Sequence, residues 1–465
     1  MPFVVPRVLG SALCARGRHG VSLLLVAATV MVPRLAAATP RADAEIAQLQ
    51  IRLAAVPTDA TAAARLAYAY IQKVRETGDP SFYVKAGELS ARATHLAPDA
   101  EETLLTAGTL ALSCHAFAEG LALGQRGRAL YPAAAPFCGI VADACIELGR
   151  YTDAAATLDT MMTLRPDLSS YARVSYLREL HGDVSGALDA MAQAQTSGSS
   201  VPENVAWCAV QTGGLALGSG RLDDAARAFA YAHHVLPRYA PAMGGLARVA
   251  LARGDAAAAE SLYRAANDIL PLAENLIGLG ELLEVSGRGA EAARQYALVR
   301  AVIQLQRAAG VDADIEFALF AADHPRPPAT GAVVGRRKSG NRGNLADSGD
   351  RGDPVALVAQ ARAARDRRPS VKSDDVLAWT QYRAGEFAAA DSASCRALRL
   401  GTEDALMYYH AGMIAAAQGD TTRAALALHH ALALSPRFTA CGARDARARL
   451  AQLRPDNVAR GEGGR

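Results

Sequence analysis

The sequence predicts an all-α fold, and two observations carry the prediction. The chain of 465 residues is 51% hydrophobic but only 5% aromatic, so small apolar residues, mostly alanine, supply its apolar fraction. Alanine is the best helix former, whereas the strands of a sandwich or barrel need β-branched and aromatic residues. Glycines and prolines also recur about every 34 residues. This recurrence indicates a repeated helical unit in place of the three or so globular domains that the length alone allows.

The charge balance excludes two classes of protein. Charged residues make up 20% of the chain, and the formal net charge is +3. A disordered protein would need low hydrophobicity and a high net charge. A nucleic-acid-binding protein would need a basic surface, which this balance does not indicate. We therefore expect a folded protein without a nucleic-acid partner.

The first 38 residues have the three parts of a secretory signal peptide. Residues 1–20 contain three arginines and no acidic residue, residues 21–32 are an apolar run, and a small-x-small site ends at Ala38. The apolar run of 12 residues is too short for a membrane-spanning helix, which needs about 20. We expect a signal peptide over 1–38, cleavage near Ala38, and a periplasmic or secreted mature chain with no integral membrane segment. The alternative is an uncleaved helix that anchors the chain at the membrane interface.

The 34-residue period defines a unit of two helices. Pro98, Pro132 and Pro166 follow one another at this spacing, and so do Gly385 and Gly419. Each glycine lies in a short turn between two stretches whose apolar residues have helical spacing. The glycine ends the first helix, and the proline follows the second helix, which cannot continue through it. The turns are at residues 148–151, 181–184, 219–222, 253–256, 286–289, 384–387 and 418–421.

This unit resembles the tetratricopeptide repeat, and the resemblance covers most of residues 45–450. Its implied fold is a tetratricopeptide α-solenoid, a right-handed superhelix of antiparallel helix pairs that bury their apolar faces by stacking. Further copies surround Gly220, Gly287 and Gly419. The copy that matches the repeat pattern best does so at Leu246, Ala247, Ala250, Gly254, Ala259, Tyr263, Ala266 and Pro271.

The repeats fall into two blocks separated by an insertion. We expect about seven copies over 45–323 and about two and a half over 355–452, closed by a capping helix near 443–452. The segment 324–354 is rich in Gly, Pro, Arg, Asn and Asp and lacks apolar periodicity, so we expect a disordered insertion. The polar tail over 453–465 is expected to be disordered as well.

The insertion interrupts one repeat. Residues 303–323 are consistent with the end of one helix, a turn at Gly310 and a second helix, whose partner is expected at about 355–368. The basic run at 336–338 inside the insertion is either a contact patch or part of a solvated linker. A solvated linker is the interpretation we favour.

The cysteines allow two interpretations in an exported chain. An even number permits disulfides, but Cys138 and Cys145 would lie about 10 Å apart on one helix, which is too far for a bridge. We favour the role of small buried apolar side chains. No spacing of cysteines or histidines typical of a zinc site is present. The six cysteines that follow the signal peptide are Cys114, Cys138, Cys145, Cys208, Cys395 and Cys441.

No catalytic motif is present, so we expect a protein that is not an enzyme and that holds neither a cofactor nor a metal. The chain lacks the nucleophile elbow, the phosphate-binding loop and the H-E-x-x-H zinc motif. The adjacent glycines Gly213 and Gly214 fall on helix-packing positions with no preceding strand. The adjacent histidines His429 and His430 would point about 100° apart on a helix and could not easily share one ion.

The resemblance implies a protein-binding groove on the concave face, which the first helix of each pair lines. Both tryptophans of the chain fall in this set, and aromatic and arginine side chains concentrate binding energy when a groove exposes them. The alternative is that each side chain packs between neighbouring repeats. The predicted protein-binding residues are Tyr68, Arg173, Tyr176, Glu179, Trp207, Gln211, Arg248, Glu281, Glu284, Trp379, Tyr382, Arg383, Tyr409 and His410.

The function that these features predict is a scaffold or adaptor that binds a protein or peptide in the cell envelope. Family members that clamp a C-terminal carboxylate use asparagine at positions where this chain has Asp143, Tyr176, Gly214 and Arg248, so that function is not expected. One alternative is an α/α enzyme acting on envelope polysaccharide, which would need paired carboxylates and many aromatic platforms. Another is a regulatory module of a larger signalling system.

Overall fold

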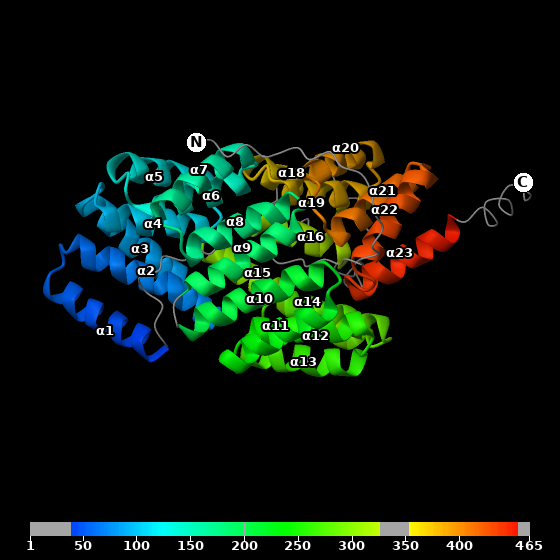
Figure 1. The fold of residues 1–465 in the computed structure, drawn as a ribbon, viewed down its shortest axis with the longest axis horizontal. Coiled ribbons are helices and arrows are strands. Elements are labelled where there is room, and N and C mark those ends of the chain that lie inside the picture. The colour runs from blue at the N-terminus through cyan, green and yellow to red at the C-terminus, as the bar shows by residue number, and fades with distance from the viewer. Residues whose placement is uncertain (1–38, 199–200, 326–352, 454–465) are drawn as a thin grey trace, which may run out of the picture.

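The computed structural model describes residues 39–198, 201–325 and 353–453. The predicted signal peptide, residues 326–352 of the predicted insertion and the tail from residue 454 lie outside these ranges. The described residues form 22 α-helices in consecutive antiparallel pairs and one short 3-10 helix. This arrangement confirms the all-α solenoid (Figure 1).

Ten helix pairs follow α1 (Thr39–Ala55), and we number them repeats 1 to 10. The pairs are α2 (Ala60–Thr77) and α3 (Ser81–Leu96), α4 (Glu101–Ser113) and α5 (Phe117–Leu130), α6 (Ala135–Glu147) and α7 (Tyr151–Leu164), α8 (Leu168–Leu180) and α9 (Val184–Ser197), α10 (Pro202–Gly218) and α11 (Leu222–Val235), α12 (Ala240–Arg253) and α13 (Ala256–Ile269), α14 (Ala273–Val285) and α15 (Gly289–Ala308), α16 (Asp314–Asp323) and α18 (Pro354–Arg367), α19 (Val371–Arg383) and α20 (Phe387–Ala397), and α21 (Ala405–Ala417) and α22 (Thr421–Leu434). The 3-10 helix Leu398–Leu400 follows α20, and α23 (Ala440–Gln452) comes last.

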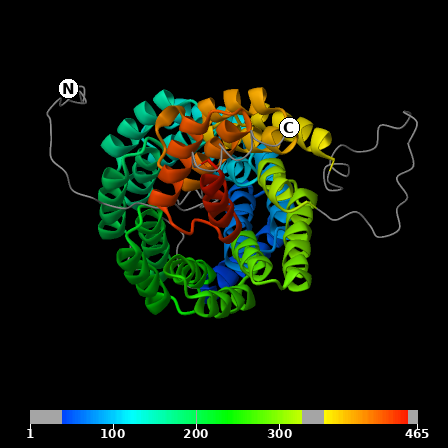
Figure 2. The same ribbon diagram turned by 90° about the vertical axis from the view of Figure 1, so that its right-hand side faces the viewer.

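The first helices of the pairs form an inner layer, and we call them the inner helices. Successive inner helices contact one another, as α2 does α4 and α16 does α19. They are also the most enclosed elements, since nearly every residue of α6 is buried. The second helices lie outside them, and Figure 2 shows the pairs as a ring around the long axis of the molecule.

The small residues of the repeat are explained by close helix packing. A Cβ atom placed on Gly245 of α12 would lie 2.2 Å from the ring of Phe229 on α11. A side chain of any size at this position would therefore displace the aromatic ring that fills the space between repeats 5 and 6. This contact supports the view that the excess of alanine and glycine serves packing.

The superhelix closes on itself after six repeats. In Figure 1, α18 (yellow) lies beside α7 (teal). The turn between the two helices of a repeat packs against the loop that precedes the repeat six places later, and we call this line of contacts the seam. The seam pairs are Gly78 with Leu270, Cys114 with Asp312, Gly149 with Pro369, and Gly182 with Gly401.

Hydrogen bonds cross the seam at each of its later steps. The amide of Asp312 donates to the carbonyl of Cys114 at 3.0 Å, and the amide of Val371 donates to the Tyr151 hydroxyl at 2.8 Å. Thr402 Oγ1 donates to the carbonyl of Leu180 at 2.5 Å. Asp312 precedes α16 and Val371 is the first residue of α19, so neither amide has an acceptor within its own helix. The seam therefore satisfies backbone groups that would otherwise need water.

A buried ion pair also crosses the seam. Arg368, in the loop before repeat 9, donates to Glu147 of α6 at 2.7 Å and to Glu316 of α16 at 3.0 Å. Glu147 is only 2% exposed, so its carboxylate has lost its hydration and is stabilised mainly by the Arg368 guanidinium. Repeats 1 to 6 form the first superhelical turn, and the repeats from 7 onward form the second. The two superhelical turns are therefore joined by an ion pair as well as by backbone contacts.

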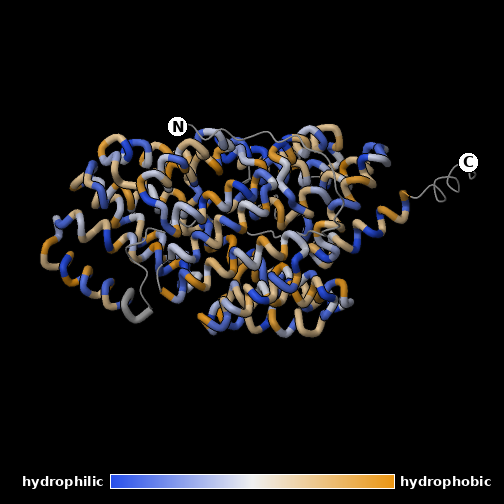
Figure 3. Tube along the Cα trace, in the orientation of Figure 1, coloured by the Kyte–Doolittle hydropathy of each residue, from blue (hydrophilic) through white to orange (hydrophobic). Residues whose placement is uncertain are grey.

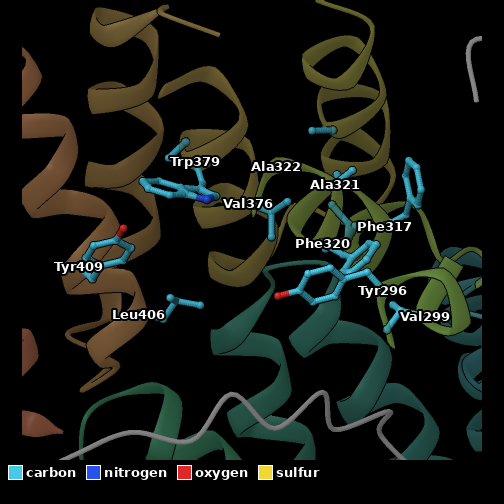
Figure 4. Packing of buried hydrophobic residues seen from close by; sticks show 14 of the residues in the cluster. Tyr296, Val299, Phe317, Phe320, Ala321, Ala322, Val376, Trp379, Leu406 and Tyr409 are labelled. Carbon is cyan, nitrogen blue, oxygen red and sulfur yellow. The ribbon is translucent and has the colours of Figure 1, made fainter. Parts of the chain in front are cut away.

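Repeat 8 follows repeat 7 after a turn at Gly310. The helix α15 ends at Ala308, Gly310 follows with a φ of 87°, and α16 begins at Asp314, which confirms the turn predicted within 303–323. The helix expected near 355–368 is α18. Packing across this step relies on aromatic rings, since Tyr296 of α15 contacts Phe320 of α16 with centroids 6.0 Å apart (Figure 4).

Hydropathy varies within every element. Hydrophobic and hydrophilic residues alternate along the helices (Figure 3). Over the described ranges, none of the helices combines the length and the apolar character needed to cross a bilayer.

The described cysteines are not bonded to one another. Cys138, Cys145 and Cys208 are buried, as predicted, whereas Cys395 is exposed. For Cys395 the expectation of a buried apolar role is wrong, because it lies on the outer side of α20.

Candidate protein-binding site

All fourteen predicted residues lie on inner helices, from α2 to α21, and their exposure divides them into two sets. The partly or fully exposed set is Tyr176, Glu179, Trp207, Gln211, Arg248, Glu284, Tyr382 and Arg383. The buried set is Tyr68, Arg173, Glu281, Trp379, Tyr409 and His410. For the buried set the structure supports packing between helices, which was the alternative considered for each residue.

Arg173 is held within the fold by Asp143. Its Nε and Nη2 atoms donate to the two carboxylate oxygens at 2.9 and 2.7 Å, which joins α8 to α6. Burial raises the pKa of Asp143, and the adjacent guanidinium opposes this shift. Since both groups are buried and bonded, Arg173 forms an internal ion pair that joins repeats 3 and 4, and its side chain is not exposed for contact with a partner.

A second polar group gathers around Lys372, the residue after the seam amide Val371. Its ammonium lies 4.9 Å from the ring centroid of Tyr176, a cation–π distance. Glu179 and Asp404 face the same region, and burial raises their pKa values to about 7 and about 6. Lys372 lowers both values again, but by less than burial raises them. Two of the predicted residues, Tyr176 and Glu179, are thus brought together by a lysine from the second superhelical turn.

An aromatic stack surrounds Trp379 on α19. The indole lies between Tyr382, with centroids 4.8 Å apart, and His410, with centroids 4.2 Å apart. Its Nε1 donates to Asp323 at the end of α16 at 2.7 Å. Tyr409 closes the stack from α21 (Figure 4). Only Tyr382 of these rings keeps an accessible edge, so the stack is mainly core.

His410 is fully buried beside Asp375. Its Nδ1 lies 3.0 Å from a carboxylate oxygen of Asp375, while Nε2 has no hydrogen-bond partner within the described residues. Burial lowers the pKa of His410, but the Asp375 charge and hydrogen bond outweigh burial, and the net pKa is raised. The pair ties α21 to α19 in the same way as Arg173 ties α8 to α6.

Glu281 of α14 is bonded by the last helix of the chain. Its Oε2 accepts the backbone amides of Ala440 and Cys441, at the start of α23, at 3.0 and 3.3 Å. The Nε2 atom of His324 lies 3.8 Å from the other carboxylate oxygen. Burial, followed by repulsion from Asp323, raises the pKa of Glu281 to about 7. The site at Glu281 is therefore filled by part of the chain itself.

Several residues of these clusters were not predicted from the sequence. Lys372, Asp323 and His324 lie at helix ends next to loops, where the repeat pattern assigns no inward position. Asp375 lies on α19 but points to a histidine two helices away. Within the described ranges no group of three or more His, Cys, Asp or Glu side chains is arranged to hold a metal ion.

The fold and the inner layer define the class: an α-solenoid of stacked helix pairs. Residues 216–274, which run from the end of α10 through α11, α12 and α13 to the start of α14, match the family model "Tetratricopeptide repeat". This part of the chain therefore matches the tetratricopeptide repeat, the family that the sequence pattern around Gly254 resembles. No curated protein matches the chain in sequence.

Several solved structures are similar to this chain at low sequence identity. The human IFIT1 dimer with PPP-AAAA is 13% identical, with 74% of this chain and 73% of that chain covered and a TM-score of 0.43. Yeast Tom70 is 12% identical over 86% and 99% of the two chains, with a TM-score of 0.31. A tetratricopeptide repeat protein from Parabacteroides merdae is 16% identical over 62% and 98%, with a TM-score of 0.30. We draw no conclusion about ligands from these likenesses.

Proposed function

We propose that this chain is a non-enzymatic scaffold that binds a protein or peptide partner along its inner helices. The observation that carries the proposal is that three of the predicted aromatic residues on the inner helices remain partly exposed: Tyr176, Trp207 and Tyr382. Partly exposed aromatic residues on a rigid framework are the residue types that concentrate binding energy at protein interfaces. Because they lie in repeats 4, 5 and 9, the partner would be an extended or helical segment that spans several repeats.

We also propose that the scaffold acts outside the cytoplasm, in the cell envelope. The support is the pattern of the first 38 residues, with its basic start, short apolar run and small-x-small site. Mass spectrometry of the exported protein is expected to find a new N-terminus near Thr39. An intact Met1 on cytoplasmic protein would contradict the proposal.

The binding surface is tested with matched aromatic variants. Envelope extract is passed over the immobilised wild-type protein and over Trp207→Ala, Tyr382→Ala and Tyr231→Ala. Tyr231 is the control, since it is 46% exposed but lies on the outer helix α11. We expect both inner variants to lose the same partner, with about tenfold weaker affinity each, and Tyr231→Ala to retain it.

Thermal melts of all four proteins separate lost binding from lost folding, because Trp207 also packs against buried neighbours. Equal capture of the same partners by all three folded variants would refute the proposal.

A further inference from the structure

The last helix does not continue the superhelix. By the six-repeat register of the seam, the loop before α23 should lie against the turn of repeat 5. Instead the Arg437 guanidinium lies against Gly254 in the turn of repeat 6, where a Cβ atom would overlap it. From there α23 runs to α14 of repeat 7 while it keeps contact with α21 and α22. In Figure 2, α23 (red) lies toward the middle of the ring of helices.

The N-terminus of α23 is its polar anchor. The first turn of a helix has amides without intrahelical acceptors and carries partial positive charge. Thr439 Oγ1 accepts the amide of Gly442, and Glu281 accepts the amides of Ala440 and Cys441. Glu281 thus holds α23 largely by the feature that any helix start shares, and the side chain of Thr439 adds a further hydrogen bond to Glu281.

The fully buried contact of α23 consists of small side chains, and the partly buried Leu450 packs against the core toward the end of the helix. Its buried residues are Gly442, Ala443 and Ala446, while Arg444 and Arg447 are exposed. By contrast, α22 buries Leu428 and Leu434 in addition to its alanines. Because hydrophobic stabilisation scales with the apolar area buried, α23 is held more weakly than the helices of the repeats.

We propose that α23 occupies a docking site for a partner helix, formed by α14 and α21 around Glu281, and that the partner displaces it. The partner is a short helix with a free first turn for Glu281, glycine or alanine on the first half of its contact face, leucine toward its end and arginines on its outer face, since these are the features with which α23 fits. This proposal rests on the proposed function, because it names the kind of partner that the inner helices take.

The test uses the full chain and a fluorescent peptide of residues 436–453. In the release variant, Ala443→Glu with Ala446→Glu, the two buried alanines of α23 become charged and the repeats stay unchanged. Fluorescence anisotropy should show that the peptide binds the release variant at least about tenfold more tightly than the wild type, whose site is filled. Adding Glu281→Gln to the release variant should weaken binding by about tenfold. Equal binding to wild type and release variant, or no effect of Glu281→Gln, would overturn the proposal.

A second measurement does not depend on the release variant. In hydrogen exchange of the single variants, Glu281→Gln should speed exchange of the α23 amides by about tenfold and leave those of α22 unchanged. Glu260→Gln is the control, because Glu260 lies on α13 and bonds Arg264 and Arg288, neither of which belongs to α23. Unchanged exchange in Glu281→Gln would overturn the proposal as well.

The two proposals fail separately. If the peptide does not bind but Trp207→Ala still loses its partner, then α23 is not the occupant of the site and recognition on the inner helices stands. If the peptide binds but Trp207→Ala and Tyr382→Ala keep every partner, then the partly exposed aromatic residues are not the binding surface.

Discussion

The turns of repeats 3 and 4 and those of repeats 9 and 10 have the same backbone but different surroundings. Gly149, Gly182, Gly385 and Gly419 all have φ between 68° and 81°. A Cβ atom on Gly149 or Gly182 would lie 2.3 Å from a carbonyl oxygen of the second superhelical turn, whereas on Gly385 or Gly419 it would meet nothing within 4 Å. The repeat sets the backbone of every turn, and closure of the superhelix decides which turns tolerate a side chain.

The largest expected difference in stability is between an ion pair that the seam buries and an ion pair that is exposed to solvent. Arg368→Ala leaves Glu147 buried without its partner, which should lower the free energy of unfolding by about 3–5 kcal/mol. Arg253→Ala removes an exposed pair with Asp223 and should change it by at most about 0.5 kcal/mol. Urea denaturation followed by circular dichroism measures both. Similar losses in the two variants would show that the seam is not closed in solution.

The turn glycines give the second test. Gly419→Ala places a non-glycine residue at positive φ, which should cost about 1 kcal/mol. Gly182→Ala has the same cost and also a clash with the carbonyl of Gly401, which should add about 2 kcal/mol or more. The midpoints of chemical denaturation report the difference. Equal midpoints would mean that the second superhelical turn moves away at little cost.

The pH dependence of stability compares Glu281 with an open carboxylate. The pKa of Glu281 is about 7 when folded and about 4.5 in an unfolded chain, so above pH 4.5 the unfolded state releases the proton more easily. The free energy of unfolding should therefore fall between about pH 4.5 and pH 7, by up to about 3 kcal/mol from this group. Glu179 and Asp404 contribute with the same sign.

The control for this pH dependence is Glu260, on the outer helix α13. Its pKa is lowered by hydrogen bonds from Arg264 and Arg288, so its contribution is lost at acid pH and not between pH 5 and pH 7. In melts at pH 5, 6, 7 and 8, Glu281→Gln should flatten the wild-type slope and Glu260→Gln should not. If Glu281→Gln left the slope of stability against pH unchanged, burial of Glu281 would not be the cause of that slope.

The smallest expected effect is at the turn of repeat 2, where a histidine stands in place of glycine. His115 has a φ of 61°, and its Nδ1 donates across the seam to the carbonyl of Asp312 at 2.8 Å. His115→Gly removes the strain and the bond together, so stability should stay within about 1 kcal/mol. His115→Ala keeps the strain and loses the bond, so thermal melts should show a loss of about 1–2 kcal/mol. A stabilised His115→Ala would contradict the seam bond.

The sequence predicted the local fold because the repeat is local. Gly254 ends α12, and Ala259, Tyr263 and Ala266 face the neighbouring helices, as their spacing requires. The turn of repeat 2 was not among the predicted turns, because His115 interrupts the series of glycines. The seam could not be predicted, since its register depends on small rotations added over six repeats, which no single spacing reveals.

The candidate site was predicted only in part. The helix on which each residue lies follows from the register, but its burial depends on what the rest of the chain brings to it. Arg173 is covered through Asp143, Trp379 through Asp323, and Glu281 through α23. Nothing in the composition of α23 identifies it as a helix that crosses to repeat 7, because its contact face of small residues with one leucine is like that of the helices in the repeats.

The central claim is that the second superhelical turn packs on the first, and hydrogen exchange at two amides tests it most directly. The amides of Asp312 and Val371 have their acceptors, the Cys114 carbonyl and the Tyr151 hydroxyl, in the first turn. The account predicts slow exchange at both, comparable to the interior of α19, and faster exchange at Val371 in Tyr151→Phe. Exchange at the rate of an unprotected amide in the wild-type protein would contradict the closed superhelix.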